Sequence, residues 1–81
     1  MHIPGKLSSL ADLSVGRTGT ISSVELNGLL RRRVLDLGML PGTQVQCIRR
    51  SPAGDPIAFR VRNTTIALRS DDASLIKISL M

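Results

Sequence analysis

The side chains that could carry out catalysis are few and far apart in this chain of 81 residues. The single histidine, His2, stands close to Pro4 and Gly5, which interrupt any regular structure and leave the imidazole without a fixed neighbour. A serine or cysteine nucleophile needs such a neighbour as its base, so neither kind of catalytic set can be assembled. Asp71 and Asp72 are the only adjacent carboxylates, and a capping role at the start of a helix explains them better. We therefore expect a protein that is not an enzyme.

The same shortage of ligands argues against a metal site or a cofactor. A catalytic zinc site needs three protein ligands and a structural site about four, usually His and Cys, and this chain has one of each. Cys47 alternates with polar residues in a run rich in Val and Ile, which is typical of a small buried side chain rather than of a reactive thiol. One alternative stays open, a weak site formed by the N-terminal amine, His2 and a carboxylate. We expect no metal and no cofactor.

Positive charge is the strongest feature of the composition. Eleven Lys and Arg against six Asp and Glu give a net charge of +5, which suits nucleic acid, an anionic membrane surface or an acidic protein. Several basic residues occupy outward positions of the second half of the chain: Arg60, Arg62, Arg69, Lys77 and, less clearly, Arg50. Proteins that bind single strands stack bases on exposed rings, but the only aromatic residue, Phe59, is in phase with Ile57 and Val61 and is expected in the core. A solvated strand face is the first interpretation, followed by a protein contact and then by nucleic acid.

A helix predicted over residues 28–37 carries the sharper signal. Leu30, Val34 and Leu37 fall on one apolar stripe at 100° per residue, whereas Leu29 projects among arginines. An apolar side chain ringed by Arg is a common composition for a protein-binding patch, although a single exposed leucine is also ordinary. The turn after the helix holds two more large apolar residues, which its own geometry does not require. The predicted partner-binding residues are Leu29, Arg32, Arg33, Met39 and Leu40.

The elements that must position these residues are short. Residues 1–8 are predicted to be a flexible tail, and residues 9–81 a single domain. A helical turn at 9–13, capped by Ser8 or Ser9, should direct Leu10 and Leu13 inward. Gly16 marks a turn and Gly19 a close backbone approach, within or next to a strand at 18–24. The helix follows, and Gly38 in the left-handed conformation should end it before a turn at 41–42.

Beyond that turn the apolar residues recur with a period of two. Strands are expected around residues 45–47, 57–61, 66–68 and 76–80, with a tight turn at 63–64 in which Asn63 takes a positive φ. Residues 70–73 read as a capped helical or 3₁₀ turn. Strands that are apolar on one face only cannot be buried on both sides. The expected fold is mainly β, a small antiparallel barrel of about five strands with one short α-helix after the first strand, and closure of the barrel would remove the exposed edges.

The longest apolar stretches fall far short of the roughly 20 residues that a membrane span needs. The first residues lack the apolar run of a signal peptide. We expect a soluble, cytoplasmic protein.

Several of these segments resemble one known family. Residues 33–42 (RVLDLGMLPG) are similar to the signature of the FeoA family, ferrous iron transport protein A. Residues 54–57 (GDPI), residues 66–69 (IALR), Ala73 and Ile76 match the second half of the family in order and spacing. The resemblance covers residues 10–78. One departure is Asn63, where many relatives have Gly, and Asn can hold the same backbone conformation.

The resemblance implies a cytoplasmic SH3-like barrel that supports FeoB, a membrane ferrous-iron transporter with a cytosolic G-protein domain. Such a domain also resembles the C-terminal module of iron-dependent repressors of the DtxR type, but this chain has no DNA-binding helices. The first hypothesis is an accessory protein that binds the cytosolic part of FeoB and modulates its activity or assembly, with weak self-association left open. The alternative is a small nucleic-acid-binding or repressor-associated barrel.

Overall fold

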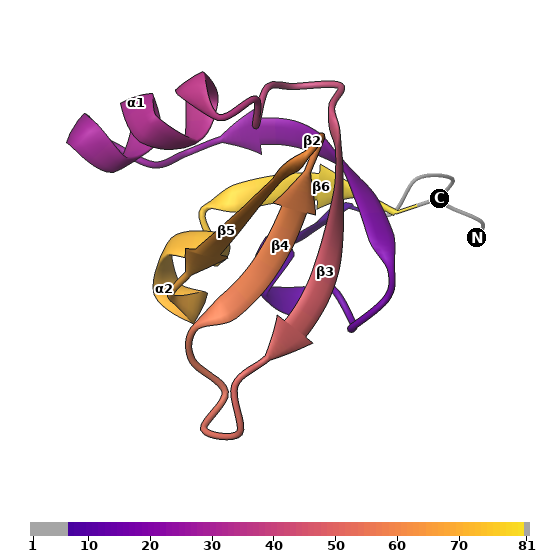
Figure 1. Ribbon diagram of the computed structural model, residues 1–81. Helices are drawn as coiled ribbons and strands as arrows, with labels where there is room; N and C mark the ends of the chain where they lie inside the picture. Colours follow the sequence, from indigo (N-terminus) through magenta and orange to yellow (C-terminus); the bar gives the residue numbers. More distant parts are fainter. Residues whose placement is uncertain (1–6, 81) are drawn as a thin grey trace.

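The computed structural model describes residues 7–80. Six strands and three short helical segments follow one another along this part of the chain (Figure 1). In order, they are β1 (Leu7–Ser9), the 3₁₀ turn η1 (Leu10–Asp12), β2 (Thr18–Val24), α1 (Gly28–Asp36), β3 (Gln44–Arg50), β4 (Ile57–Val61), β5 (Thr64–Leu68), α2 (Ser70–Ala73) and β6 (Ile76–Ser79).

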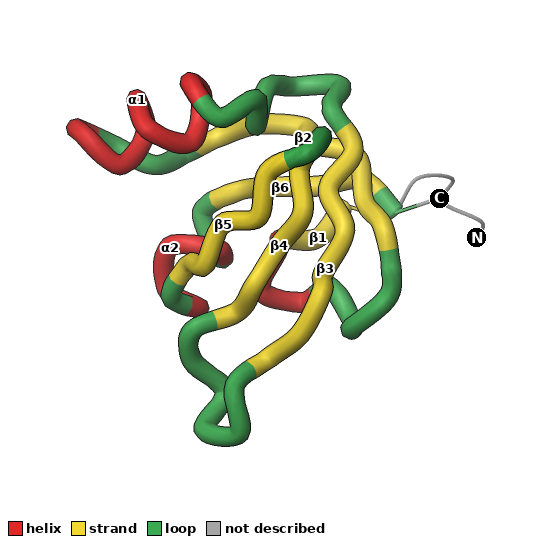
Figure 2. Tube along the Cα trace, in the orientation of Figure 1, coloured by secondary structure: helices red, strands yellow, loops and turns green. Residues whose placement is uncertain are grey.

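The strands form one antiparallel sheet in the order β1-β6-β2-β3-β4-β5. The sheet curls round on itself (Figure 2), and irregularities in register occur in β2 between Ile21 and Ser23 and in β3 between Cys47 and Arg49. The fold is mainly β, as predicted. Closure was predicted wrongly, because within residues 7–80 no ladder joins β5 to β1. β1 turns into η1 after three residues, and too little strand remains to pair with a second neighbour.

The N-terminal boundary also differs from the prediction. Leu7 and Ser8 belong to β1, where Leu7 pairs with Ser79 and Ser8 with Ile78. The prediction of a flexible tail is therefore wrong for Leu7 and Ser8, and residues 1–6 lie outside the described residues. The error arises because β1 is specified by its partner β6, about 70 residues away in sequence, and not by its own pattern.

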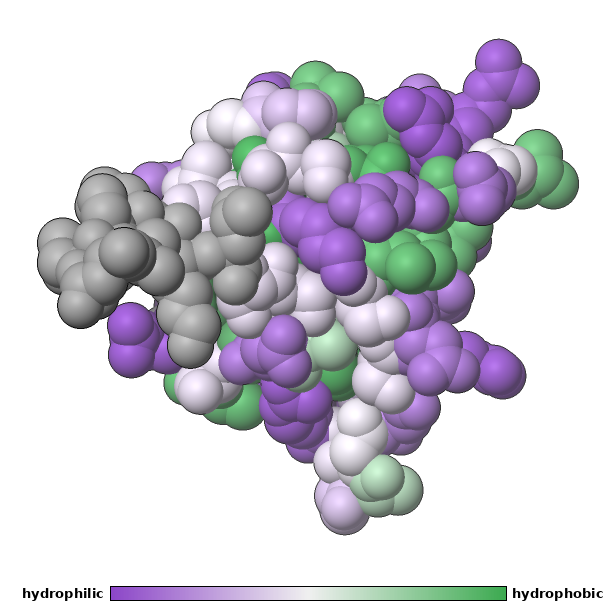
Figure 3. All heavy atoms as spheres, turned by 180° about the vertical axis from the view of Figure 1, so that it is seen from behind, coloured by the Kyte–Doolittle hydropathy of each residue, from purple (hydrophilic) through white to green (hydrophobic). Residues whose placement is uncertain are grey.

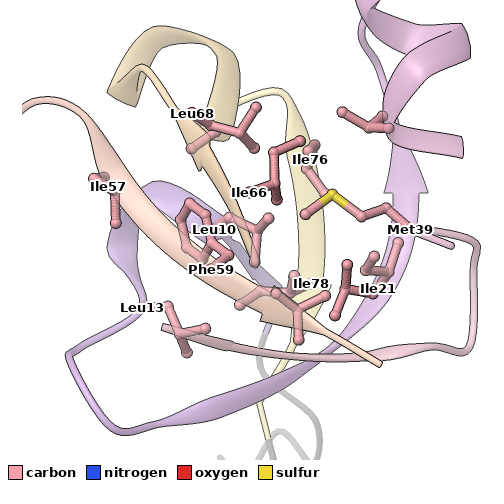
Figure 4. Close-up of a cluster of buried hydrophobic side chains, with 14 of the residues drawn as sticks. Leu10, Leu13, Ile21, Met39, Ile57, Phe59, Ile66, Leu68, Ile76 and Ile78 are labelled. Carbon is pink, nitrogen blue, oxygen red and sulfur yellow. The ribbon is translucent and has the colours of Figure 1, made fainter. Parts of the chain in front are cut away.

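The core lies inside the curl of the sheet (Figure 4). Phe59 at its centre is fully buried, and its strand neighbours in the ladders are Cys47 and Ile66. Ile57 and Val61 are buried on the same face, which confirms the predicted alternation. The main buried side chains are Leu10, Leu13, Ile21, Met39, Ile57, Phe59, Ile66, Leu68, Ile76 and Ile78.

Gly19 in β2 leaves room for the side chain of Ile78 on the neighbouring strand β6. A Cβ atom at this position would stand 2.7 Å from Cδ1 of Ile78, a separation that real contacts do not reach. Gly19 is buried, so the chain has no room for a side chain where β2 crosses the core. The close approach predicted at Gly19 is thus one between its backbone and a side chain, that of Ile78.

Two local predictions in the second half of the chain are corrected. The positive φ of the β4–β5 turn falls on Arg62 (φ 56) and not on Asn63. The cap of α2 is Asp55, not Asp71 or Asp72: its Oδ1 accepts a hydrogen bond from the Ser70 backbone N–H at 2.6 Å, and Ser70 Oγ donates to Oδ2 at 3.2 Å. Asp71 and Asp72 do lie in the first turn of α2, where negative charge is favourable.

Candidate partner-binding surface

Helix α1 extends from the end of β2 at one side of the sheet (Figure 1). Val34 in its middle is fully buried, and Leu30 and Leu37 are half-buried against the core. Leu29, the second residue of α1, is 84% exposed, and Arg31, Arg32 and Arg33 are exposed as well. Figure 3 shows the result, with hydrophobic atoms among strongly hydrophilic ones over α1 at the upper right. The apolar stripe and the outward Leu29 are therefore both where the sequence predicted them.

Met39 is not part of this surface, because its side chain is fully buried. The end of α1 explains why. The Met39 N–H donates to the Val34 carbonyl at 3.0 Å and the Gly38 N–H donates to that of Leu35 at 3.0 Å, with Gly38 at φ 104. This is the Schellman arrangement, in which the residue after the left-handed glycine packs against the last turn of the helix. The prediction that Met39 contacts a partner is wrong, and its neighbour Leu40 is 43% exposed instead.

The remaining predicted residues do not form one compact patch. Leu29 is the second residue of α1, and Leu40 lies beyond the end of the helix at Asp36, so most of the helix separates them. The helix from Leu29 to Asp36 is about 10 Å long. Leu29, Arg32, Arg33 and Leu40 thus outline an elongated surface along α1, which we call the α1 surface.

A hollow of about 320 Å³ lies between α1 and β5, and no sequence pattern predicted it. Its wall on the helix side is made by Leu30, Arg33 and Leu37, and its other wall is the whole of β5. Leu30 and Leu37 belong to the predicted apolar stripe, but the helix stands off the sheet and leaves part of each side chain exposed. Sequence pattern gives the phase of an apolar stripe, and it does not give the depth to which the stripe is inserted.

A larger hollow of about 500 Å³ lies beside η1, lined by Ser8, Ser9, Ala11, Asp12, Ser74 and Lys77. Its polar groups bond to one another. The hydroxyls of Ser8 and Ser9 donate to Asp12 Oδ2 at 3.0 and 3.2 Å, and Lys77 Nζ donates to the Ser74 carbonyl at 2.8 Å. The two serine hydroxyls hold the pKa of the Asp12 carboxyl below its ordinary value. Because these groups are already paired, the hollow has little left with which to bind a ligand.

The basic residues divide into paired and unpaired groups. Arg50 is occupied, since its Nη2 donates to the carbonyls of Ala11 at 2.6 Å and Leu13 at 3.1 Å. It fixes η1 to the end of β3 and does not belong to the basic strand face considered for it. The exposed arginines are Arg17, Arg31, Arg32, Arg33, Arg49, Arg60, Arg62 and Arg69, and within residues 7–80 none of them is engaged in an ion pair. These guanidinium groups are available to carboxylates of a partner.

The groups considered for chemistry are placed as follows. Cys47 is fully buried, and burial raises the pKa of its thiol. In residues 7–80 no three His, Cys, Asp or Glu side chains come together in a group that could hold a metal ion. His2 lies outside the described residues. Phe59, the one aromatic residue of the sequence, is 0% exposed and cannot stack on a base.

None of the helices in the part of the chain that the structure describes has the length and hydrophobicity of a membrane-spanning segment.

The strand order, the curl of the sheet and the basic helix on its side define a small SH3-like domain. The chain belongs to the FeoA family, since the model of the FeoA domain matches residues 8–80. A fusion protein of Fe(2+) transport protein A and Fe(2+) transporter FeoB from Porphyromonas gingivalis is 31% identical over 72 residues, which are 89% of this chain and 8% of the fusion protein. FeoA is thus a domain of ferrous iron transport proteins.

Solved structures agree. The FeoA protein of Chlorobium tepidum superimposes with a TM-score of 0.85 at 29% identity, over 90% of this chain and 70% of that one. The FeoA of Stenotrophomonas maltophilia, an SH3 domain protein solved in complex with zinc, gives 0.77 at 27% identity, over 86% of this chain and 87% of that one. A manganese-dependent transcriptional repressor shares the fold alone, with 0.81 at 18% identity over 98% of this chain and 44% of the repressor.

Proposed function

We propose that this chain is a cytoplasmic accessory protein of ferrous iron transport, which binds the cytosolic part of the transporter FeoB and modulates its activity or assembly without catalysing a reaction itself. The observation that carries the proposal is the relative in which the matching segment is fused to FeoB. A fusion keeps two domains at a high effective concentration, and two separate chains that must work together need a binding surface instead.

The α1 surface supplies the residues for such binding. Leu29 offers an exposed apolar side chain at one end and Leu40 at the other, and the arginines between them are free of ion pairs within residues 7–80. Arginines can pair bidentately with carboxylates and accelerate encounter. Buried apolar contacts mainly set the dissociation rate. We therefore expect Arg32 and Arg33 mainly to raise the association rate, and Leu29 and Leu40 mainly to lower the dissociation rate.

Surface plasmon resonance against the purified cytosolic region of FeoB tests this assignment. Leu29→Ala or Leu40→Ala should weaken binding by about 1–2 kcal/mol, and Arg32→Glu with Arg33→Glu should weaken it further through the on-rate. Leu75→Ala is a matched control, since Leu75 is 40% exposed and follows α2. Arg17→Glu with Arg49→Glu makes the same change of charge away from α1. If folded α1 variants bind like the wild type, α1 is not the interface. If the wild type shows no binding, the proposed function is wrong.

A further inference from the structure

Strand β5 ends the sheet with an edge that no strand within residues 7–80 covers. Its other edge pairs with β4, in a ladder that begins with Val61 opposite Thr64 and ends with Ile57 opposite Leu68. In an antiparallel ladder alternate residues direct their N–H and C=O groups away from the partner strand. Counted from the pair Val61–Thr64 that closes the two-residue turn, the outward residues are Thr65 and Ala67. Such an edge can accept another strand.

The hollow between α1 and β5 runs along this same edge, because all five residues of β5 line it. Opposite the strand, Leu30 and Leu37 present half-buried apolar surface. Five residues in extended conformation cover about 17 Å. An added strand could therefore bond to the backbone of β5 and place every second side chain against the two leucines.

The positive charge around the hollow favours an acidic occupant. Arg33 lines the hollow, and among residues 7–80 no acidic residue does so. Arg60 is exposed and faces Thr65 across the ladder. The exposed Arg62 lies at the turn before β5, and its Cδ and Nε are each 3.2 Å from where a Cβ on Gly38 would stand, so its side chain reaches the end of α1. Three guanidinium groups thus surround the edge, and none is engaged in an ion pair within residues 7–80.

We propose that β5 accepts an extended, acidic segment of the partner protein, which adds as a seventh strand between β5 and α1. The segment alternates carboxylates, which pair with Arg33, Arg60 and Arg62, with apolar side chains that fill the hollow against Leu30 and Leu37. The partner is the one named under the proposed function, on which this inference rests. A second copy of the chain fits poorly, because pairing of two β5 edges would bring two sets of these arginines together.

A synthetic probe tests the edge without the partner. The uniformly ¹⁵N-labelled chain is titrated with a capped heptapeptide of alternating Glu and Val, and in parallel with the same peptide carrying Lys in place of Glu. The acidic peptide should bind saturably, shift the amide resonances of β5 and slow hydrogen exchange at Thr65 and Ala67 at least tenfold. The Lys peptide should bind at least tenfold more weakly. If the acidic peptide leaves the amides of Thr65 and Ala67 unchanged at millimolar concentration, the inference is overturned.

The second arm uses the cytosolic region of FeoB. Ala67→Pro removes an outward N–H and should weaken binding at least tenfold while far-UV circular dichroism stays unchanged. Arg60→Glu with Arg62→Glu should do the same, and Arg17→Glu with Arg49→Glu is the control. If Ala67→Pro does not fold, hydrogen exchange is measured in the wild-type complex with FeoB instead. Slower exchange at the Thr65 and Ala67 amides supports the inference, and unchanged exchange overturns it.

The outcomes separate the two proposals. Binding of FeoB without protection of β5 overturns the inference and leaves the proposed function standing. Binding of the acidic peptide without binding of FeoB overturns the proposed function and keeps β5 as an acceptor of acidic strands. A dimer of the free chain in sedimentation that dissociates in the Ala67→Pro variant would identify a second copy as the occupant and overturn the inference.

Discussion

At the scale of single residues, Phe59 is the largest of the fully buried side chains. Its ring is fully buried between β3 and β5. We expect Phe59→Ala to lower the free energy of unfolding by about 3–5 kcal/mol, the usual cost of removing a buried aromatic side chain. Small domains have about 5–10 kcal/mol in total, so the variant should be marginal or unfolded in urea denaturation. A loss below about 1 kcal/mol would contradict the burial of the ring.

Cys47 should be chemically inert in the folded protein. The side chain is fully buried and its thiol pKa is raised by burial, so the reactive thiolate is scarce at pH 8 and no path leads a reagent to it. Ellman's reagent should label Cys47 only at the rate of unfolding, and at once in strong denaturant. Rapid labelling without denaturant would show that β3 opens locally.

Because of Asp12, the free energy of unfolding should depend slightly on pH in the acid range. Hydrogen bonds from Ser8 and Ser9 stabilise its carboxylate, so its pKa is lower in the folded than in the unfolded state. The stabilisation is present above the unfolded pKa and is lost as the pH falls through the folded one. Asp12→Asn should therefore lower stability at pH 6 and have little effect at pH 2, by urea denaturation. Asp36→Asn on α1 serves as the control for loss of an exposed carboxylate.

Prediction of single residues from the sequence succeeded where periodicity alone decides their environment. Burial of Phe59 and Cys47 was predicted correctly, because buried and less buried residues alternate along their strands. Met39 was predicted to be exposed because the geometry of a turn does not itself require a large apolar side chain. The Gly38–Met39 pair already contains the signal of a Schellman ending, whose second residue packs inward.

At the scale of elements, α2 depends on a residue that lies far from it in sequence. This helix has only four residues, and Asp55 from the β3–β4 connection caps its first N–H. We expect Asp55→Ala to cost about 0.5–2 kcal/mol, measured by urea denaturation, with amide exchange in α2 accelerated more than in β3. Asp71→Ala is the matched control, because Asp71 lies in the same helix without capping it. Equal losses for both variants would show that general charge and not the cap matters.

The sequence predicted the elements that have local signals and missed those that depend on pairing. Helix α1 and its end at Gly38 follow from an apolar stripe and a glycine. Neither β1 nor the Asp55 cap has such a signal, because each is defined by a partner distant in the chain. The hollow along β5 depends on how far α1 stands from the sheet, which no local pattern encodes.

At the scale of the whole molecule, the acidic side chains are dispersed over the surface and several are already engaged. Asp12 accepts hydrogen bonds from two serines, Glu25 accepts one from Ser23, and Asp55 caps α2. Asp36 stands apart on α1, while Asp71 and Asp72 share one turn. With Cys47 buried as a thiol, residues 7–80 contain no group of three ligands for a cation.

This dispersal predicts that ferrous iron is not held tightly by the domain. Ferrous iron needs several ligand atoms that converge on one point, and a net charge of +5 opposes its approach. The His2→Ala variant of the full chain removes the one histidine, so anaerobic titration calorimetry on it examines the rest of the protein. We expect no one-to-one binding of ferrous iron with a dissociation constant in the micromolar range or below. The wild-type chain, measured in parallel, reports any weak contribution of His2. Tight binding in the variant would mean that carboxylates now far apart come together, either within one chain or between two copies, and sedimentation with and without iron would distinguish these cases.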